Sequence, residues 1–79
     1  MEVDKFKIDC IIIIGKYNNV KTHITNLNED IVNLLNFSKY LQIKLGAQTT
    51  IENNIIIISG RHDRINLQNL LDEYLYENN

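Results

Sequence analysis

The sequence has one cysteine, no proline, no tryptophan and no long apolar run in its 79 residues. A single Cys10 excludes a disulfide within the chain, and with only His23 and His62 as other soft ligands no structural zinc site is predicted. The longest apolar run, Cys10 to Ile14, is far shorter than a signal-peptide core or a membrane span. We therefore expect a soluble, cytoplasmic protein with no membrane segment, metal or other cofactor.

Excess basic charge is also lacking, since the net charge is −2. This balance argues against a protein that coats nucleic acid by neutralising many phosphates. The charge is nevertheless uneven: between Lys5 and Lys21 four lysines face only Asp9, whereas the segment from Asp72 onward carries three acids and no cation. A local basic surface is therefore compatible with the composition.

Isoleucine and asparagine are abundant, at fourteen and twelve residues, and we attribute this bias to an AT-rich genome rather than to an adhesive tract. The length predicts one domain over residues 1–79, too small for a deep substrate cavity. No nucleophile, base and orienting group stand at a recognisable spacing, and no phosphate-binding glycine pattern is present. We therefore expect a binding protein rather than an enzyme.

The first half of the chain predicts a hairpin followed by helix. Phe6 to Ile14 is rich in β-branched residues and predicts a strand buried near its C-terminal half. Gly15 to Asn19 has turn chemistry, and Val20 to Thr25 alternates as a half-buried strand does. Asn26 and Glu29 then form a potential capping box.

Two helical stretches are expected between the hairpins. Leu27, Ile31, Leu34 and Leu35 recur at helical spacing in the first. The second runs from Ser38 until Gly46 ends it, leaving Asn36-Phe37-Ser38 as the connection.

The second half predicts another hairpin and a final helix. Gln48 to Glu52 and Ile55 to Ser59 flank the turn dipeptide Asn53-Asn54, and the four consecutive isoleucines favour a central strand buried on both faces. A helix beginning near His62 carries an apolar stripe, made of Leu67, Leu70, Leu71, Tyr74 and Leu75. The predicted order is ββααββα, an α+β two-layer domain with a mixed four-stranded sheet and the helices on one face.

Short matches to a known family occur in order along this arrangement. They are Lys5-Phe6-Lys7-Ile8, Asn18-Asn19-Val20-Lys21-Thr22, Leu45-Gly46-Ala47-Gln48-Thr49 and, around the last helix, Ser59-Gly60, His62, Leu67-Gln68 and Leu71-Asp72. With them the chain resembles the N-terminal domain of eukaryotic translation initiation factor five and the equivalent domain in the β subunit of initiation factor two. The resemblance implies a fold similar to small initiation factor one, in agreement with the predicted order.

The resemblance also implies partners: the small ribosomal subunit, the initiator tRNA and the GTPase initiation factor two. It implies an influence on start-codon selection. The chain departs from the family in lacking its four-cysteine zinc ribbon, in a shorter Gly15–Asn19 loop, and in carrying Lys5 where the family has an arginine that assists GTP hydrolysis. Because an ammonium does not reproduce guanidinium contacts with phosphate, Lys5 weakens the expectation of GTPase stimulation and leaves only a residual activity to test.

Candidate contact residues fall in two groups. Lys16, Asn18, Asn19 and Lys21 are candidate RNA contacts, with Tyr17 as a base-stacking residue; an ordinary solvated turn is the alternative. Lys5, Gln48, Arg61 and His62 are candidate partner contacts, the last two at the start of a helix; an ordinary surface is again the alternative. Cys10 is expected to be a small, buried and inert hydrophobe.

Two functions remain open at this point. The first is a monomeric translation-initiation-factor-like protein that binds the small ribosomal subunit and initiator tRNA complex. The second is a protein-interaction module or decoy that binds a host translation factor without contacting RNA. Salt dependence separates them, because RNA binding weakens steeply as salt rises and an apolar protein interface does not.

Overall fold

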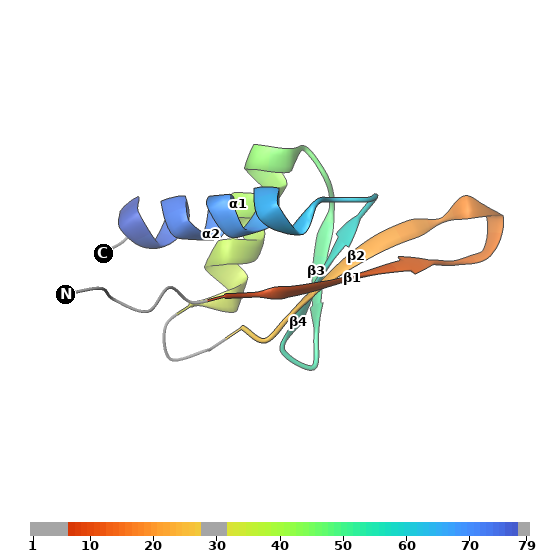
Figure 1. Ribbon diagram of the computed structural model, residues 1–79, viewed down its shortest axis with the longest axis horizontal. Helices are drawn as coiled ribbons and strands as arrows, with labels where there is room; N and C mark the ends of the chain where they lie inside the picture. The colour runs from red at the N-terminus through yellow and green to blue at the C-terminus, as the bar shows by residue number, and fades with distance from the viewer. Residues whose placement is uncertain (1–6, 28–31, 78–79) are drawn as a thin grey trace.

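Two β-hairpins and two helices make up the computed structural model, which describes residues 7–27 and 32–77. The elements are β1 (Asp9–Ile14), the short 3₁₀ turn η1 (Lys16–Asn18), β2 (Val20–Thr25), α1 (Leu34–Leu45), β3 (Thr49–Glu52), β4 (Ile55–Ser59) and α2 (Arg64–Glu77). Both helices lie on one side of the sheet, and the β1–β2 hairpin extends away from them (Figure 1). The α+β class and the placement of the helices on one face are confirmed.

The sheet has the order β1-β2-β4-β3, and all three pairings are antiparallel. The prediction of a mixed sheet is therefore corrected. The connection through α1 places β4, rather than β3, beside β2, and β4 runs opposite to β2 because it is the returning strand of its hairpin. The Asn53-Asn54 turn is confirmed, with φ values of 50° and 64° that suit a tight hairpin.

Two helical stretches were predicted between the hairpins, and the described residues of this segment contain one helix, α1. Asn36-Phe37-Ser38, expected as a connection, lies inside it, and its N-cap is Asn33, whose side chain accepts a hydrogen bond from the Asn36 amide at 3.1 Å. Asn26 instead has φ 60° and donates to the Lys7 carbonyl at 3.1 Å. Its proposed capping partner Glu29, like Ile31, lies outside the described residues.

The core lies between the helices and the sheet face they cover. Its buried side chains are Ile8, Ile24, Val32, Phe37, Leu41, Ile56, Ile58, Leu67, Leu71 and Tyr74. The predicted stripe of α2 is confirmed, although the helix begins at Arg64, two residues later than expected. Phe37 and Tyr74 join the two helices, with ring centroids 5.2 Å apart.

The opposite sheet face is not covered by the described helices, and two burial predictions are wrong for this reason. The C-terminal half of β1 is exposed rather than buried: Ile11 and Ile13 lie on this uncovered face and are 50% and 44% accessible. Ile14 lies on the other face and is 62% accessible, because the hairpin extends away from the helices there (Figure 1). The four isoleucines of β4 do form a central strand, but only Ile56 and Ile58 are fully buried, while Ile55 and Ile57 are half-buried. A sheet covered on one side buries alternate residues.

The Thr22 hydroxyl links the central strand β2 by hydrogen bonds to the loop that leads into α2. Its side chain is fully buried, and its hydroxyl donates to the Gly60 carbonyl at 2.7 Å and accepts from the His62 amide at 2.9 Å. The Gly60 amide donates in turn to the Val20 carbonyl at 2.8 Å. One hydroxyl thus satisfies a donor and an acceptor of a loop that would otherwise lack partners.

We expect Thr22→Val to destabilise the domain by about 1–3 kcal/mol, because the isosteric methyl leaves the His62 amide and the Gly60 carbonyl without their partner. Urea unfolding followed by circular dichroism measures the loss. The control is Thr50→Val on the exposed face of β3, expected to change stability by no more than about 0.5 kcal/mol. Equal effects of the two substitutions would show that the Thr22 hydroxyl contributes nothing specific.

Gly46 ends α1 as predicted, with φ 64° and its amide donating to the Gln42 carbonyl at 2.9 Å. A Cβ built there meets no atom within 4 Å, so the cost of Gly46→Ala is confined to the backbone. We expect Gly46→Ala to lower the free energy of unfolding by about 1 kcal/mol, as measured by thermal unfolding. Gly46→Asn should lower it by less, because asparagine tolerates the left-handed conformation better than alanine does. The reverse ranking would contradict this backbone explanation.

Candidate functional site

The tip of the β1–β2 hairpin, residues 15–21, extends away from the helices (Figure 1). Residues 15–19 lie beyond the part of β2 that contacts β4 and its following loop, whereas Lys21 pairs with Ser59 of β4. Two backbone hydrogen bonds close the tip: the Gly15 amide donates to the Asn19 carbonyl at 2.7 Å, and the Asn19 amide to the Lys16 carbonyl at 3.2 Å. Asn19 precedes β2, whose first residue Val20 is held by Gly60. The tip is therefore a closed turn on a long, paired stem.

The structure brings together the four residues predicted to contact RNA. Lys16, Asn18, Asn19 and Lys21 all belong to the tip, and all are exposed. The sequence from Cys10 to Thr25 contains no aspartate or glutamate, so no carboxylate of this hairpin segment neutralises the two lysines. The tip thus presents positive charge on a chain whose net charge is negative.

Tyr17 lies in the middle of the tip's 3₁₀ turn, with 98% of its surface accessible. Its φ and ψ are 60° and 34°, the left-handed region, and Asn18 follows with φ 60°. Asparagine adopts this conformation readily, but a residue as bulky as tyrosine rarely does, at a cost of about 1–2 kcal/mol. The turn therefore holds an aromatic ring in water at the expense of backbone strain.

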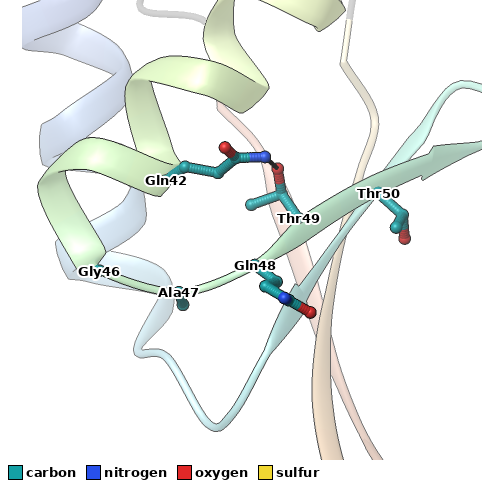
Figure 2. Close-up of a pocket in the computed structure, with 6 residues that line it drawn as sticks. All are labelled: Gln42, Gly46, Ala47, Gln48, Thr49 and Thr50. Carbon is teal, nitrogen blue, oxygen red and sulfur yellow. Dashed lines mark hydrogen bonds between the residues drawn. The ribbon is translucent and has the colours of Figure 1, made fainter.

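Gln48, from the second predicted group, lies at the turn between α1 and β3. Figure 2 shows Gln42 and Thr49 pointing toward one another, while Gln48 points away from this pair. Gln42 donates to the Thr49 hydroxyl at 2.9 Å, and Thr49 also bonds Ser38. A concavity of ≈ 530 Å³ lies here, lined by Gln42, Gly46, Ala47, Gln48, Thr49 and Thr50. The side chain of Gln48 is exposed.

His62 and Arg61 precede α2, and their environments differ. The His62 ring nitrogen Nε2 lies 2.9 Å from the Ser59 carbonyl, and its amide is bonded by Thr22. Arg61 is exposed and lines, with Cys10, Ile12, His62, Asp63 and Arg64, a second concavity of ≈ 390 Å³. Arg61 is thus open to a partner, whereas the His62 side chain already contributes to the loop's own structure.

Sheet register links the two predicted groups. Ile13 pairs with Lys21, Lys21 with Ser59, and the Ser59 amide donates to the Gln48 carbonyl at 3.0 Å. Lys21 and Gln48 are therefore separated by one strand, about 10 Å across the sheet. The remaining predicted contact, Lys5, lies outside the described residues.

Sequence reasoning missed the exposed isoleucines of the uncovered sheet face. Ile11, His23 and Ile57 lie in one row of that face, and Ile13 lies in the next. The signal that could reveal them is alternation, but two runs of four isoleucines carry none, because both faces of each strand have the same residue. Only the position of the helices decides which isoleucines are exposed.

Cys10 is half-buried rather than buried, and desolvation by burial raises the pKa of its thiol, with the opposing charge of Arg64 having a smaller effect. A raised pKa keeps the thiol protonated at neutral pH, which favours the expected inert role. Within residues 7–27 and 32–77, no cluster of three histidine, cysteine or acidic residues is placed to hold a metal ion. Nor does either described helix have the length and apolar character needed to cross a membrane.

Comparisons with known proteins identify the family of this domain. Residues 2–77 match the model of a family described as a domain found in initiation factors 2B and 5. The chain is 37% identical over 67 residues to eukaryotic translation initiation factor 5 of Caenorhabditis elegans, covering 77% of this chain and 15% of that protein. It is 40% identical over 68 residues to the probable eukaryotic translation initiation factor 5 of Schizosaccharomyces pombe, covering 77% of this chain and 17% of that protein.

The matched part of this chain spans about a sixth of the length of these two relatives, so the similarity concerns one part of each. The family match extends over nearly all of the chain and includes every described strand and helix. The chain therefore belongs to the family of domains found in initiation factors 2B and 5.

Proposed function

We propose that this domain acts in translation initiation by binding RNA of the small ribosomal subunit and initiator tRNA complex through its hairpin tip. The observation that carries the proposal is the tip itself: two lysines without a neighbouring carboxylate in the hairpin segment, and Tyr17 held almost fully in water. The two relatives are named as initiation factors, which supports this biological setting.

Each tip residue has a distinct part in the proposed contact. Lys16 and Lys21 bind phosphate oxygens, which supplies affinity without sequence preference. Asn18 and Asn19 offer amide donors and acceptors to sugars and base edges, and Tyr17 stacks on an unpaired base. The hairpin extends away from the helices (Figure 1). In the proposed contact this shape lets the tip enter an RNA groove that is too narrow for the wider body of the domain.

Gln48 and Arg61 are proposed as accessory contacts to a protein of the same complex, such as the GTPase initiation factor two. Gln48 lies about 10 Å from Lys21 across the sheet, so a partner bound beside the RNA reaches it without passing over a helix. Contact at this position during start-codon recognition is how the domain influences start-codon selection. The proposed role is one of binding rather than catalysis.

Lys16→Glu combined with Lys21→Glu is expected to weaken binding to small ribosomal subunits at least tenfold, about 1.4 kcal/mol, because both phosphate contacts are lost and repulsion is added. Co-sedimentation with purified eukaryotic small subunits, with and without initiator tRNA, measures the affinity. Repeated over a salt series, the slope of log affinity against log salt should fall by about 1.5 in the variant.

The control is Lys39→Glu combined with Lys44→Glu on α1, which makes the same change in net charge away from the tip. This variant should bind subunits with the wild-type affinity and salt slope, as judged after a melting curve confirms that it is folded. If both double variants lost subunit affinity equally, the loss would reflect net charge alone, and the tip would have no specific part in binding. Wild-type binding that does not respond to salt would instead favour the alternative, a module that contacts a host translation factor through protein alone.

Tyr17→Gly separates binding from folding. Glycine adopts the observed φ without strain but adds unfolded-state entropy, so the two effects oppose and stability should change by less than about 1 kcal/mol. Subunit affinity should nevertheless fall about tenfold, since stacking on one base contributes about 1–3 kcal/mol. Tyr76→Ala, at an exposed tyrosine of α2, is the matched control and should bind normally. Unchanged affinity of the Tyr17 variant would remove stacking from the mechanism.

A further inference from the structure

Strand β1 is an edge strand with none of the usual protection against further pairing. Among the described residues it pairs only with β2, in an unbroken register from Asp9 to Ile14 with no bulge. Its residues after Asp9 are one cysteine and four isoleucines. Natural edge strands usually carry lysine, proline or a bulge that blocks the addition of another strand. β1 therefore presents its free backbone edge as a template for one more strand.

The side chains of β1 also lack cover. Ile11 and Ile13 lie on the face away from the helices and are 50% and 44% accessible, and Ile14 on the other face is 62% accessible. The half-buried Ile57 lies in the same row as Ile11, two strands away, and extends the apolar surface inward from the edge. A strand added at β1 would place its own side chains beside these isoleucines and would also satisfy the free backbone groups of the edge.

The pattern of β1 is complementary to itself when reversed. The apolar run Cys10–Ile14 is centred on Ile12, with the acidic Asp9 directly before it and Gly15 and the basic Lys16 directly after it. A two-fold axis between identical antiparallel strands places one residue opposite its own copy. With Ile12 at that position, Ile11 faces Ile13 of the second copy and Cys10 faces Ile14 of the second copy.

The charges agree with the same register. Asp9 then lies opposite Gly15 of the second copy, one position along the chain from the basic Lys16 of that copy, and the same arrangement recurs at the other end. Centring the pair on Ile11 instead would place the charged Asp9 opposite the apolar Ile13. Cross-strand apolar pairs stabilise a sheet, and only the Ile12 register of these two pairs every residue of the run Cys10–Ile14 with another apolar residue.

We propose that two copies of this chain associate through antiparallel pairing of β1 with β1, with Ile12 on the two-fold axis. The product is a continuous sheet of eight strands, four from each copy, with all four helices on the same face. Because the strands are antiparallel, the two hairpin tips point in opposite directions and both Tyr17 rings remain in solvent. This dimer departs from the monomer expected from the sequence, where the exposure of β1 was not visible, and it does not depend on RNA binding.

Sedimentation velocity over a wide range of protein concentration tests the association. The wild-type chain should shift from monomer toward dimer as concentration rises, and Ile13→Lys should weaken the association at least about tenfold by placing a charge at the new seam. Ile43→Lys is the matched control, because Ile43 is 82% exposed on α1, which packs against β3 at the opposite edge of the sheet. That variant should dimerise like the wild type.

Disulfide trapping tests the register. In a Cys10→Ser background, Ile12→Cys places the two cysteines directly opposite each other with Cα atoms about 4.5–5.5 Å apart, a separation that an intermolecular disulfide formed under mild oxidation allows. Ile14→Cys in the same background separates the thiols by roughly 13 Å along the strand and should not cross-link at a comparable rate. Preferential cross-linking of the first variant, together with a concentration-dependent dimer, supports the proposal.

A monomer at every concentration overturns the proposal and leaves the edge open to a strand from a different protein. Equal cross-linking of both cysteine variants overturns it as well, because it indicates random collisions rather than a fixed register. A dimer that Ile43→Lys disrupts and Ile13→Lys does not would place the interface on α1 and equally contradict pairing through β1.

Discussion

The packing of both helices against one face of the sheet is the constraint on which the remaining features depend. Two helices of twelve and fourteen residues bury one layer of side chains from a four-stranded sheet and leave the other layer in contact with solvent. The core is consequently built from alternate strand residues, such as Ile24, Ile56 and Ile58, together with one stripe from each helix. The described side chains on the other sheet face, and those of the hairpin tip, which no helix covers, remain available for contacts with partners.

This arrangement lets the domain combine a fixed base with a projecting tip. The base is rigid because Thr22, fully buried in β2, bonds the loop between β4 and α2, and that loop in turn bonds Val20 at the start of β2. The outer part of the tip, residues 15–19, lies beyond this support and is held by hydrogen bonds within the hairpin itself. A partner of the tip therefore meets a short, preorganised turn rather than a loose loop, which reduces the entropy lost on binding.

Sequence patterns predicted the parts of the fold where residue chemistry differs between faces or where a turn has a specific requirement. Val20 to Thr25 was interpretable because threonine, isoleucine and valine alternate with lysine and histidine, and Gly46 and Asn53-Asn54 were interpretable because they tolerate positive φ. The isoleucine runs did not reveal which of their residues are buried, because an unbroken run has no alternation to identify the buried face. The start of α1 was misplaced because Asn26 and Asn33 are both plausible caps, and only the folded structure shows that Asn33 bonds the helix while Asn26 bonds Lys7.

The candidate site was predictable in position but not in conformation. Glycine, asparagine and lysine between two strands identify an exposed tip, yet no sequence rule predicts that Tyr17, rather than an asparagine alone, takes the left-handed conformation there. A turn with asparagine or glycine at both positions would avoid the strain, and the neighbouring asparagines show that such residues are compatible with this loop. Strain that persists at an exposed position, where no packing compensates for it, is more readily explained by what the ring contacts in a complex than by the stability of the free domain. The same reasoning applies to β1, whose exposed isoleucines do not contribute to the core of one chain but would lie beside the side chains of a paired strand.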